Sequence, residues 1–238
     1  MEKETIVISK KYILIHSEDD YVIVDTGSPL SYHKSGQLSF GGISHECQTS
    51  IIGVDGDALS EETGMHVVGL IGMDILNSCH NVLFDYGNAQ IIVNDDQWDE
   101  SNLTPLSSGT KMSIPYIDIL IEGKKARVLV DTGAPISYIS EAYTNGLPIK
   151  DRLHDYNPAL GKFLTDVRDA KVEIGTNTHV MPFGNLPSHV HMLLKLMGAD
   201  GVIGYELFSR YELLYQNRQW YICSGSHLQS FKISLRKE

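Results

Sequence analysis

Cysteine is scarce in this sequence of 238 residues. The three cysteines, Cys47, Cys79 and Cys223, are odd in number and lie far apart. This argues against a disulfide framework and favours free thiols in a reducing compartment. The N-terminus leads directly into a strand-like segment, without the apolar stretch of a secretory signal. We therefore expect a cytoplasmic protein.

Long hydrophobic runs and an excess of positive charge are also missing. No apolar run approaches the roughly 18 residues of a membrane-spanning helix, so we expect no membrane partner. The 30 acidic residues outnumber the 19 basic ones, and the net charge of −11 argues against nucleic-acid binding. The hydrophobic content of 42% is typical of a globular protein of one domain or of two lobes. We expect a monomer.

A duplicated motif is the main feature that is present. The tripeptide Asp-Thr-Gly occurs at residues 25–27, after the apolar run 21–24, and again at residues 131–133, after the apolar run 128–130. The likeness continues without a gap through Tyr32 and Tyr138. Two carboxylates that face each other can perform acid–base hydrolysis, so this repeat points to chemistry as well as to a fold.

Further landmarks repeat in the same order. Residues 69–76 match residues 201–208, and each segment consists of an apolar pair, a glycine and a short predicted helix with an acid in its first turn. A predicted strand pair follows each helix, over 81–86 and 90–93 in the first copy and over 212–215 and 219–222 in the second. Matching landmarks in one order indicate an internal duplication.

These motifs resemble those of the aspartic proteases, specifically the single-chain, two-lobed proteins that are retropepsin-like or miniature pepsin-like. The resemblance covers roughly residues 5–223. It implies a mostly-β fold of two pseudo-symmetric acid-protease lobes with the active site in the cleft between them. We expect an N-terminal lobe over residues 1–97, a polar linker over 98–110 and a C-terminal lobe over 111–238.

The expected activity is that of an aspartic endopeptidase with Asp25 and Asp131 as its catalytic residues. Two adjacent carboxyl groups share one proton; the charged one activates a water molecule and the protonated one donates to the scissile carbonyl. This chemistry requires no metal and no cofactor. The expected partner is a polypeptide substrate in an extended conformation, with apolar residues at the scissile bond. The alternatives are a non-catalytic peptide-binding module and a self-processing protease with one target.

Six residues next to the two aspartates are expected to support them: Thr26, Gly27, Ser28, Thr132, Gly133 and Ala134. The glycines let main-chain amides approach the carboxylates, and by resemblance the threonines cross-link the two loops. The Ser28 hydroxyl can donate to Asp25, whereas Ala134 has no hydroxyl for Asp131. We therefore expect the charge on Asp25, the proton on Asp131 and a mildly acidic to neutral pH optimum.

The intervals between the landmarks differ, with 47 positions from Asp25 to Gly72 and 73 from Asp131 to Gly204. Only the second has room for the β-hairpin flap that the resemblance implies, so we expect one flap, from the C-terminal lobe. An ordinary surface hairpin is the alternative. The expected flap and substrate-binding residues are Tyr156, Asn157, Pro158, Ala159, Leu160, Gly161 and Phe163, with Tyr156 or Phe163 lining the cleft.

The apolar residues between Phe183 and Met197 favour a core helix. The alternative is a loop and a short helix at the edge of the cleft.

Overall fold

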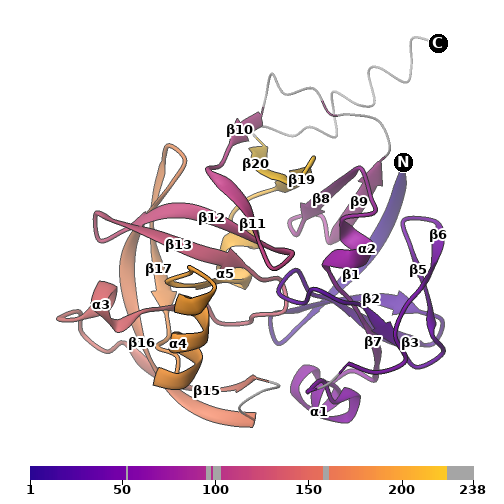
Figure 1. The fold of residues 1–238 in the computed structure, drawn as a ribbon, viewed down its shortest axis with the longest axis horizontal. Coiled ribbons are helices and arrows are strands. Elements are labelled where there is room, and N and C mark those ends of the chain that lie inside the picture. The colour runs from indigo at the N-terminus through magenta and orange to yellow at the C-terminus, as the bar shows by residue number, and fades with distance from the viewer. Residues whose placement is uncertain (52, 95–97, 99–102, 158–160, 224–238) are drawn as a thin grey trace.

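The computed structural model describes residues 1–51, 53–94, 98, 103–157 and 161–223. The protein is mostly β, with two main sheets of ten and eight strands and a few short helices (Figure 1). The helices are α1 (Gly56–Thr63), α2 (Met73–Leu76), α3 (Glu141–Thr144), α4 (Ser188–Leu196) and α5 (Tyr205–Phe208). Among the described residues, none of these helices has the length and hydropathy that crossing a membrane requires.

The N-terminal half is built around a parallel strand pair. β3 and β7 run parallel, and β4 pairs with β7 in the antiparallel sense. The strands of this half are β1 (Glu2–Ser9), β2 (Tyr12–Ser17), β3 (Asp20–Val24), β4 (Tyr32–His33), β5 (Gln37–Phe40), β6 (Ile43–Glu46), β7 (Val67–Ile71), β8 (Asn81–Asp85) and β9 (Gln90–Asn94). β5 and β6 form a separate two-stranded sheet.

The C-terminal half repeats this arrangement. β13 and β18 run parallel, and β14 pairs with β18 in the antiparallel sense. Val24 lies opposite Ile71 in the first half, and Val130 lies opposite Ile203 in the second. The eight-stranded sheet comprises β11 (Ser108–Lys111), β12 (Ile114–Ile121), β13 (Lys124–Val130), β14 (Tyr138–Ile139), β15 (Asp151–Asn157), β16 (Gly161–Ile174), β17 (Asn177–Phe183) and β18 (Gly201–Ile203).

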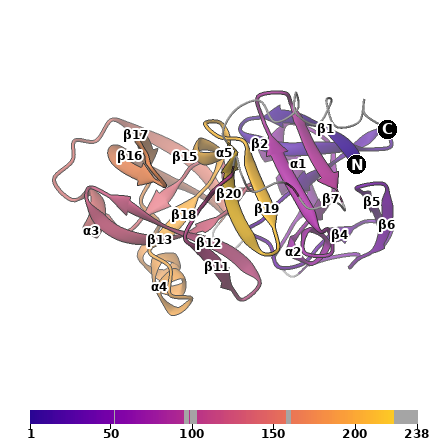
Figure 2. The ribbon, with the colours of Figure 1, turned by 90° about the horizontal axis from the view of Figure 1, so that it is seen from above.

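Strands from both ends of the chain share the ten-stranded sheet. β19 (Leu213–Gln216), β20 (Gln219–Cys223) and β10 (Leu103–Pro105) continue the sheet beyond β8 (Figure 1). Figure 2 shows β19 and β20 side by side between the two halves of the molecule. β10 lies in the stretch that the sequence predicts to be a linker, where Trp98 and Leu103 are buried. β11, from the same stretch, pairs with β12 of the other sheet.

Candidate active site

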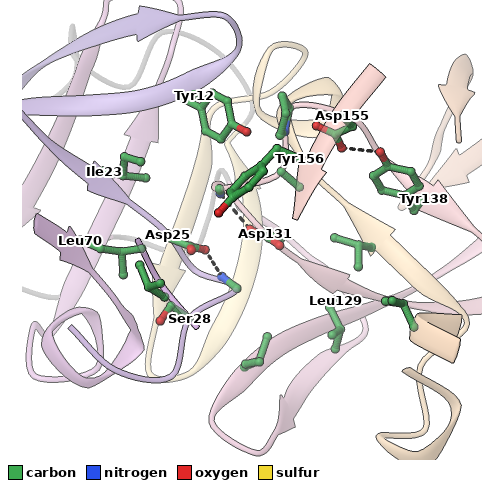
Figure 3. A pocket seen from close by; sticks show the side chains of 18 of the residues that line it. Tyr12, Ile23, Asp25, Ser28, Leu70, Leu129, Asp131, Tyr138, Asp155 and Tyr156 are labelled. Carbon is green, nitrogen blue, oxygen red and sulfur yellow. Dashed lines mark hydrogen bonds between the residues drawn. The ribbon is translucent and has the colours of Figure 1, made fainter. Parts of the chain in front are cut away.

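The duplicated aspartates follow equivalent strands. Asp25 comes directly after β3 and its amide donates to the carbonyl oxygen of Ile71 at 2.8 Å, while Asp131 follows β13 and donates to Ile203 at 3.0 Å. Each carboxyl group thus lies at the carboxyl end of a parallel strand pair. Both line one cleft, where they lie close together (Figure 3).

Thr26 and Thr132 join the two loops reciprocally. The Thr26 amide donates to Oγ1 of Thr132 at 2.9 Å, and the Thr132 amide donates to Oγ1 of Thr26 at 3.0 Å. Each hydroxyl in turn donates across the interface, Thr26 to the carbonyl of Val130 and Thr132 to that of Val24, both at 2.7 Å. Both threonines are buried, so these four bonds replace contacts with water and hold the two loops in one geometry.

The glycine after each threonine is required because the aspartate of the other loop lies directly against it. A Cβ atom at Gly27 would lie 2.4 Å from the Asp131 carboxyl carbon, and one at Gly133 would lie 2.6 Å from that of Asp25. Each glycine amide also donates at 2.8 Å to Oδ1 of the aspartate in its own loop. These two positions therefore orient the carboxyl groups and leave room for them to meet.

Burial and their mutual interaction shift the pKa values of the two carboxyl groups to different extents. Removal from water raises the pKa of both, and the charge of Asp25 raises the pKa of Asp131 further. Hydrogen bonds from Asp131 and from the amides of Gly27 and Ser28 counteract the rise at Asp25. The pKa of Asp131 is therefore raised further than that of Asp25. A charge on Asp25 and a proton on Asp131 stay a prediction.

The predicted origin of this asymmetry is wrong. The Ser28 hydroxyl donates to the carbonyl oxygen of Leu30 at 2.7 Å instead of to Asp25. A serine hydroxyl readily donates a hydrogen bond to a main-chain carbonyl two residues away, and here it does so in preference to the carboxylate. The groups that lower the pKa of Asp25 are the Asp131 carboxyl group and then the main-chain amides of Gly27 and Ser28. Ala134, at the equivalent position of the second loop, has no hydroxyl group.

The cleft around the pair has a volume of about 530 Å³ and is mainly apolar. Both halves of the chain contribute to its walls. The N-terminal half supplies, among others, Tyr12, Ile23, Leu59 and Leu70. The C-terminal half supplies, among others, Ile114, Leu129, Leu194 and Val202.

The hairpin of β15 and β16 reaches over this cleft from the C-terminal half. Tyr156 lines the cleft and packs against the buried cluster of Tyr12 and Leu59. Beyond the turn, Lys162 forms ion pairs with Glu61 at 2.8 Å and with Glu62 at 3.3 Å, both in α1. The hairpin is thus tied to the opposite half of the molecule.

The other residues of the expected flap have different positions. Phe163 packs on Tyr138, with ring centroids 6.0 Å apart, and is not among the residues that line the cleft. Asn157 ends β15 and Gly161, with a φ of 71°, begins β16. Pro158, Ala159 and Leu160 lie outside the described residues.

The sequence analysis does not predict several of the residues that line the cleft. Tyr12, Tyr138 and Asp155 all line the cleft. Tyr138 ends the second copy of the duplicated motif, which was an available signal, whereas nothing local marks Tyr12 or Asp155.

The expectation of a core helix between Phe183 and Met197 is wrong. α4 lies at the edge of the cleft, where Val190 and Leu194 line the wall, while Leu193 and Leu196 are exposed. Composition identifies the segment as apolar, but only tertiary packing decides which side of the helix is covered. Within the described part of the chain, no group of three or more His, Cys, Asp or Glu side chains could hold a metal ion.

No protein-family model and no curated protein sequence matches this chain, so what the site can do follows from its own geometry.

Proposed function

We propose that the chain is an aspartic endopeptidase, a single-chain member of the aspartic protease family with two pseudo-symmetric lobes and its active site in the cleft between them. The observation that carries this proposal is the pair of neighbouring carboxyl groups, Asp25 and Asp131, in one mainly apolar cleft. Two loops of matching sequence, locked by Thr26 and Thr132, present this pair. A module that only bound peptides would need no such pair.

In the proposed reaction, a water molecule is held between the two carboxyl groups. Asp25 accepts a proton from this water, and the resulting nucleophile attacks the scissile carbonyl carbon while Asp131 donates its proton to the carbonyl oxygen. Collapse of the tetrahedral intermediate breaks the C–N bond, as Asp25 returns its proton to the leaving amine and Asp131 recovers one from the intermediate. Both groups end in their starting states.

The surroundings of the pair support an extended polypeptide as the substrate. The apolar walls on both sides suit apolar side chains next to the scissile bond, whose burial contributes about 25 cal/mol per Å². The β15–β16 hairpin covers the site as a flap from the C-terminal lobe and would exclude bulk water during the reaction.

A comparison of the wild-type chain with the isosteric variants Asp25→Asn and Asp131→Asn tests the proposal. Each protein is incubated with a diverse peptide library at pH 4 to 7, and the products are identified by mass spectrometry. We expect cleavage by the wild type and a loss of at least about 10³-fold in either variant, since each lacks one half of the acid–base pair. Circular dichroism verifies that the variants are folded.

A statine-containing peptide provides a second measure, because it mimics the tetrahedral intermediate and should inhibit the wild type. If all three proteins leave every peptide intact yet bind peptides equally, the protein is a peptide-binding module and the proposal is wrong.

A further inference from the structure

A third carboxylate lines the cleft and has no part in the proposed reaction. Asp155 belongs to β15, next to Tyr156, and is partly buried in the cleft. Figure 3 shows it beside Tyr138, in the neighbourhood of Tyr12 and Tyr156. It lines the same cleft as Asp25 and Asp131, and its charge adds to the rise in the pKa of Asp131.

The contacts of Asp155 leave its charge unbalanced. The Tyr138 hydroxyl donates to Oδ2, and the main-chain amide of Tyr156 also bonds to the carboxylate. Both donors are neutral, and together they occupy only part of the acceptor capacity of a carboxylate. Among the described residues none forms an ion pair with Asp155. Lys162, on the same hairpin, pairs instead with Glu61 and Glu62.

The charged side chains that line the cleft, among the described residues, are all acidic. Burial and the nearby charge of Glu62 raise the pKa of Asp155, and burial together with the charges of Asp155 and Glu62 raises the pKa of Tyr12. A partly buried carboxylate without a counter-ion is an unfavourable arrangement, and a ligand cation would relieve it. A neutral or acidic ligand would not.

We propose that Asp155 determines specificity by binding a basic side chain, Lys or Arg, of the polypeptide substrate next to the scissile bond. This inference rests on the proposed peptidase function and adds a charged subsite to an otherwise apolar cleft. The aliphatic stem of a lysine would lie along the rings of Tyr12 and Tyr156, and its ammonium group would reach the free acceptor positions of Asp155.

Binding measured without turnover tests the inference separately from the activity. The host is the Asp25→Asn variant, which is compared with the double variant Asp25→Asn, Asp155→Asn. Peptides that differ only in carrying lysine, norleucine or glutamate at one position are titrated by calorimetry, with that position moved along the peptide. Norleucine keeps the apolar stem of lysine without its charge.

We expect the Asp25→Asn protein to bind the lysine peptide about tenfold more tightly than the norleucine peptide at one position, as a charge-assisted hydrogen bond would provide. The Asp155→Asn substitution should reduce this ratio to about one, because asparagine keeps an acceptor for Tyr138 and loses only the charge. Equal affinities at every position, or a ratio that survives Asp155→Asn, would overturn the inference.

Tyr138→Phe is the matched control for a merely structural role of Asp155. It removes the hydroxyl that donates to Asp155 and leaves the carboxylate in place, so the lysine preference should remain. A loss as large as that in Asp155→Asn would assign the effect to hairpin placement and overturn a direct role of the charge.

Cleavage of the same peptides by the otherwise wild-type chain should show the lysine preference in kcat/KM, mainly through KM. Failure to cleave any of them would count against the peptidase proposal alone, because the binding ratio decides the role of Asp155 independently.

Discussion

At the scale of single residues, burial, the interaction between the two carboxyl groups and main-chain amides shift the pKa values of the aspartate pair. The Ser28 hydroxyl is turned toward the Leu30 carbonyl and away from Asp25. The amides of Gly27 and Ser28 lower the pKa of Asp25, and any non-proline residue at position 28 would retain both amides. The asymmetry between Ser28 and Ala134 therefore has less influence on the chemistry than their side chains imply.

The Ser28→Ala variant should accordingly keep the pH dependence of kcat/KM. We expect the acidic limb of the profile to move by less than about half a pH unit, because no hydrogen bond to the carboxylate is lost. If the hydroxyl did stabilise charged Asp25, its removal would raise the pKa of Asp25 and move that limb to higher pH. A shift of about one unit in that direction would contradict the prediction.

The buried aspartate pair should also cost stability at neutral pH. The pKa of Asp131 in the folded protein lies well above its ordinary value. The stability contribution of a group with a raised pKa is fully present below the unfolded-state pKa and is lost as the pH rises toward the folded-state pKa. The wild type therefore loses stability, relative to a variant without this titration, from about pH 4 upward.

Asp131→Asn should remove this loss. We expect the Tm difference, variant minus wild type, to increase between pH 4 and pH 8, by about 2–4 °C for each kcal/mol regained in a chain of this size. The amide oxygen of asparagine can still accept the Gly133 amide. Scanning calorimetry at several pH values measures the difference, and one that is constant with pH would contradict the pKa assignment.

At the scale of elements, the sequence predicts what depends on local pattern. The apolar runs before Asp25 and Asp131 form β3 and β13, and the short helices with Asp74 and Glu206 in their first turns form as α2 and α5. Each of these features is visible within about ten residues of sequence, where periodicity and turn chemistry act.

Features that depend on tertiary packing could not be predicted in the same way. The apolar content of α4 is compatible with a core position or with a cleft wall, and nothing local indicates that Leu196 is 80% exposed. The acceptor of the Ser28 hydroxyl depends on the fold of its loop, and the place of Asp155 depends on a hairpin packed against the other half of the chain. The hydrophobic pattern of a segment indicates a helix or a strand, whereas the neighbouring elements determine which of its faces is buried.

The hairpin of β15 and β16 should be held over the cleft mainly by Tyr156. Lys162 is more than half exposed, so its ion pairs with α1 contribute at most about 1 kcal/mol. Tyr156 packs against buried apolar side chains, including Leu59. Tyr156→Ala should therefore open the hairpin and reduce the hydrogen-exchange protection of β15 and the first part of β16 by about tenfold.

Leu164→Ala is the matched control, because Leu164 lies on the same hairpin and is half exposed. Its exchange pattern should resemble that of the wild type. A uniform loss of protection across the chain in Tyr156→Ala would indicate general destabilisation and contradict a local opening. Unchanged protection would mean that the cross-cleft contact does not hold the hairpin.

At the scale of the whole molecule, the two halves are joined through a common sheet and a common core. β19 pairs with β8, so Leu213 lies opposite Phe84 although the two residues are far apart in sequence. The largest cluster of buried side chains includes Ile13 of the N-terminal half and Ile117 of the C-terminal half. We therefore expect the two halves to unfold together in a single cooperative transition.

Trp220 provides the test of this coupling. Its side chain is 1% exposed and packs against Phe84, Phe208 and Tyr215, at ring-centroid distances of 5.6, 5.9 and 5.0 Å. Trp220→Ala should lower the free energy of unfolding by about 3–5 kcal/mol through lost burial and the cavity left behind.

Because Trp220 contacts strand β8 of the first half as well as elements of the second, its loss should shift the whole transition. Urea unfolding monitored by circular dichroism, and thermal unfolding measured by calorimetry, should each show a single transition in the wild type and in the variant. In the variant, the transition should occur at a lower urea concentration and at a lower temperature. Met112→Ala, at a side chain that is 75% exposed, should change the free energy by less than about 0.5 kcal/mol. Two separate transitions, of which only one moves in Trp220→Ala, would instead show that each half has an independent core, and that the shared sheet does not couple them.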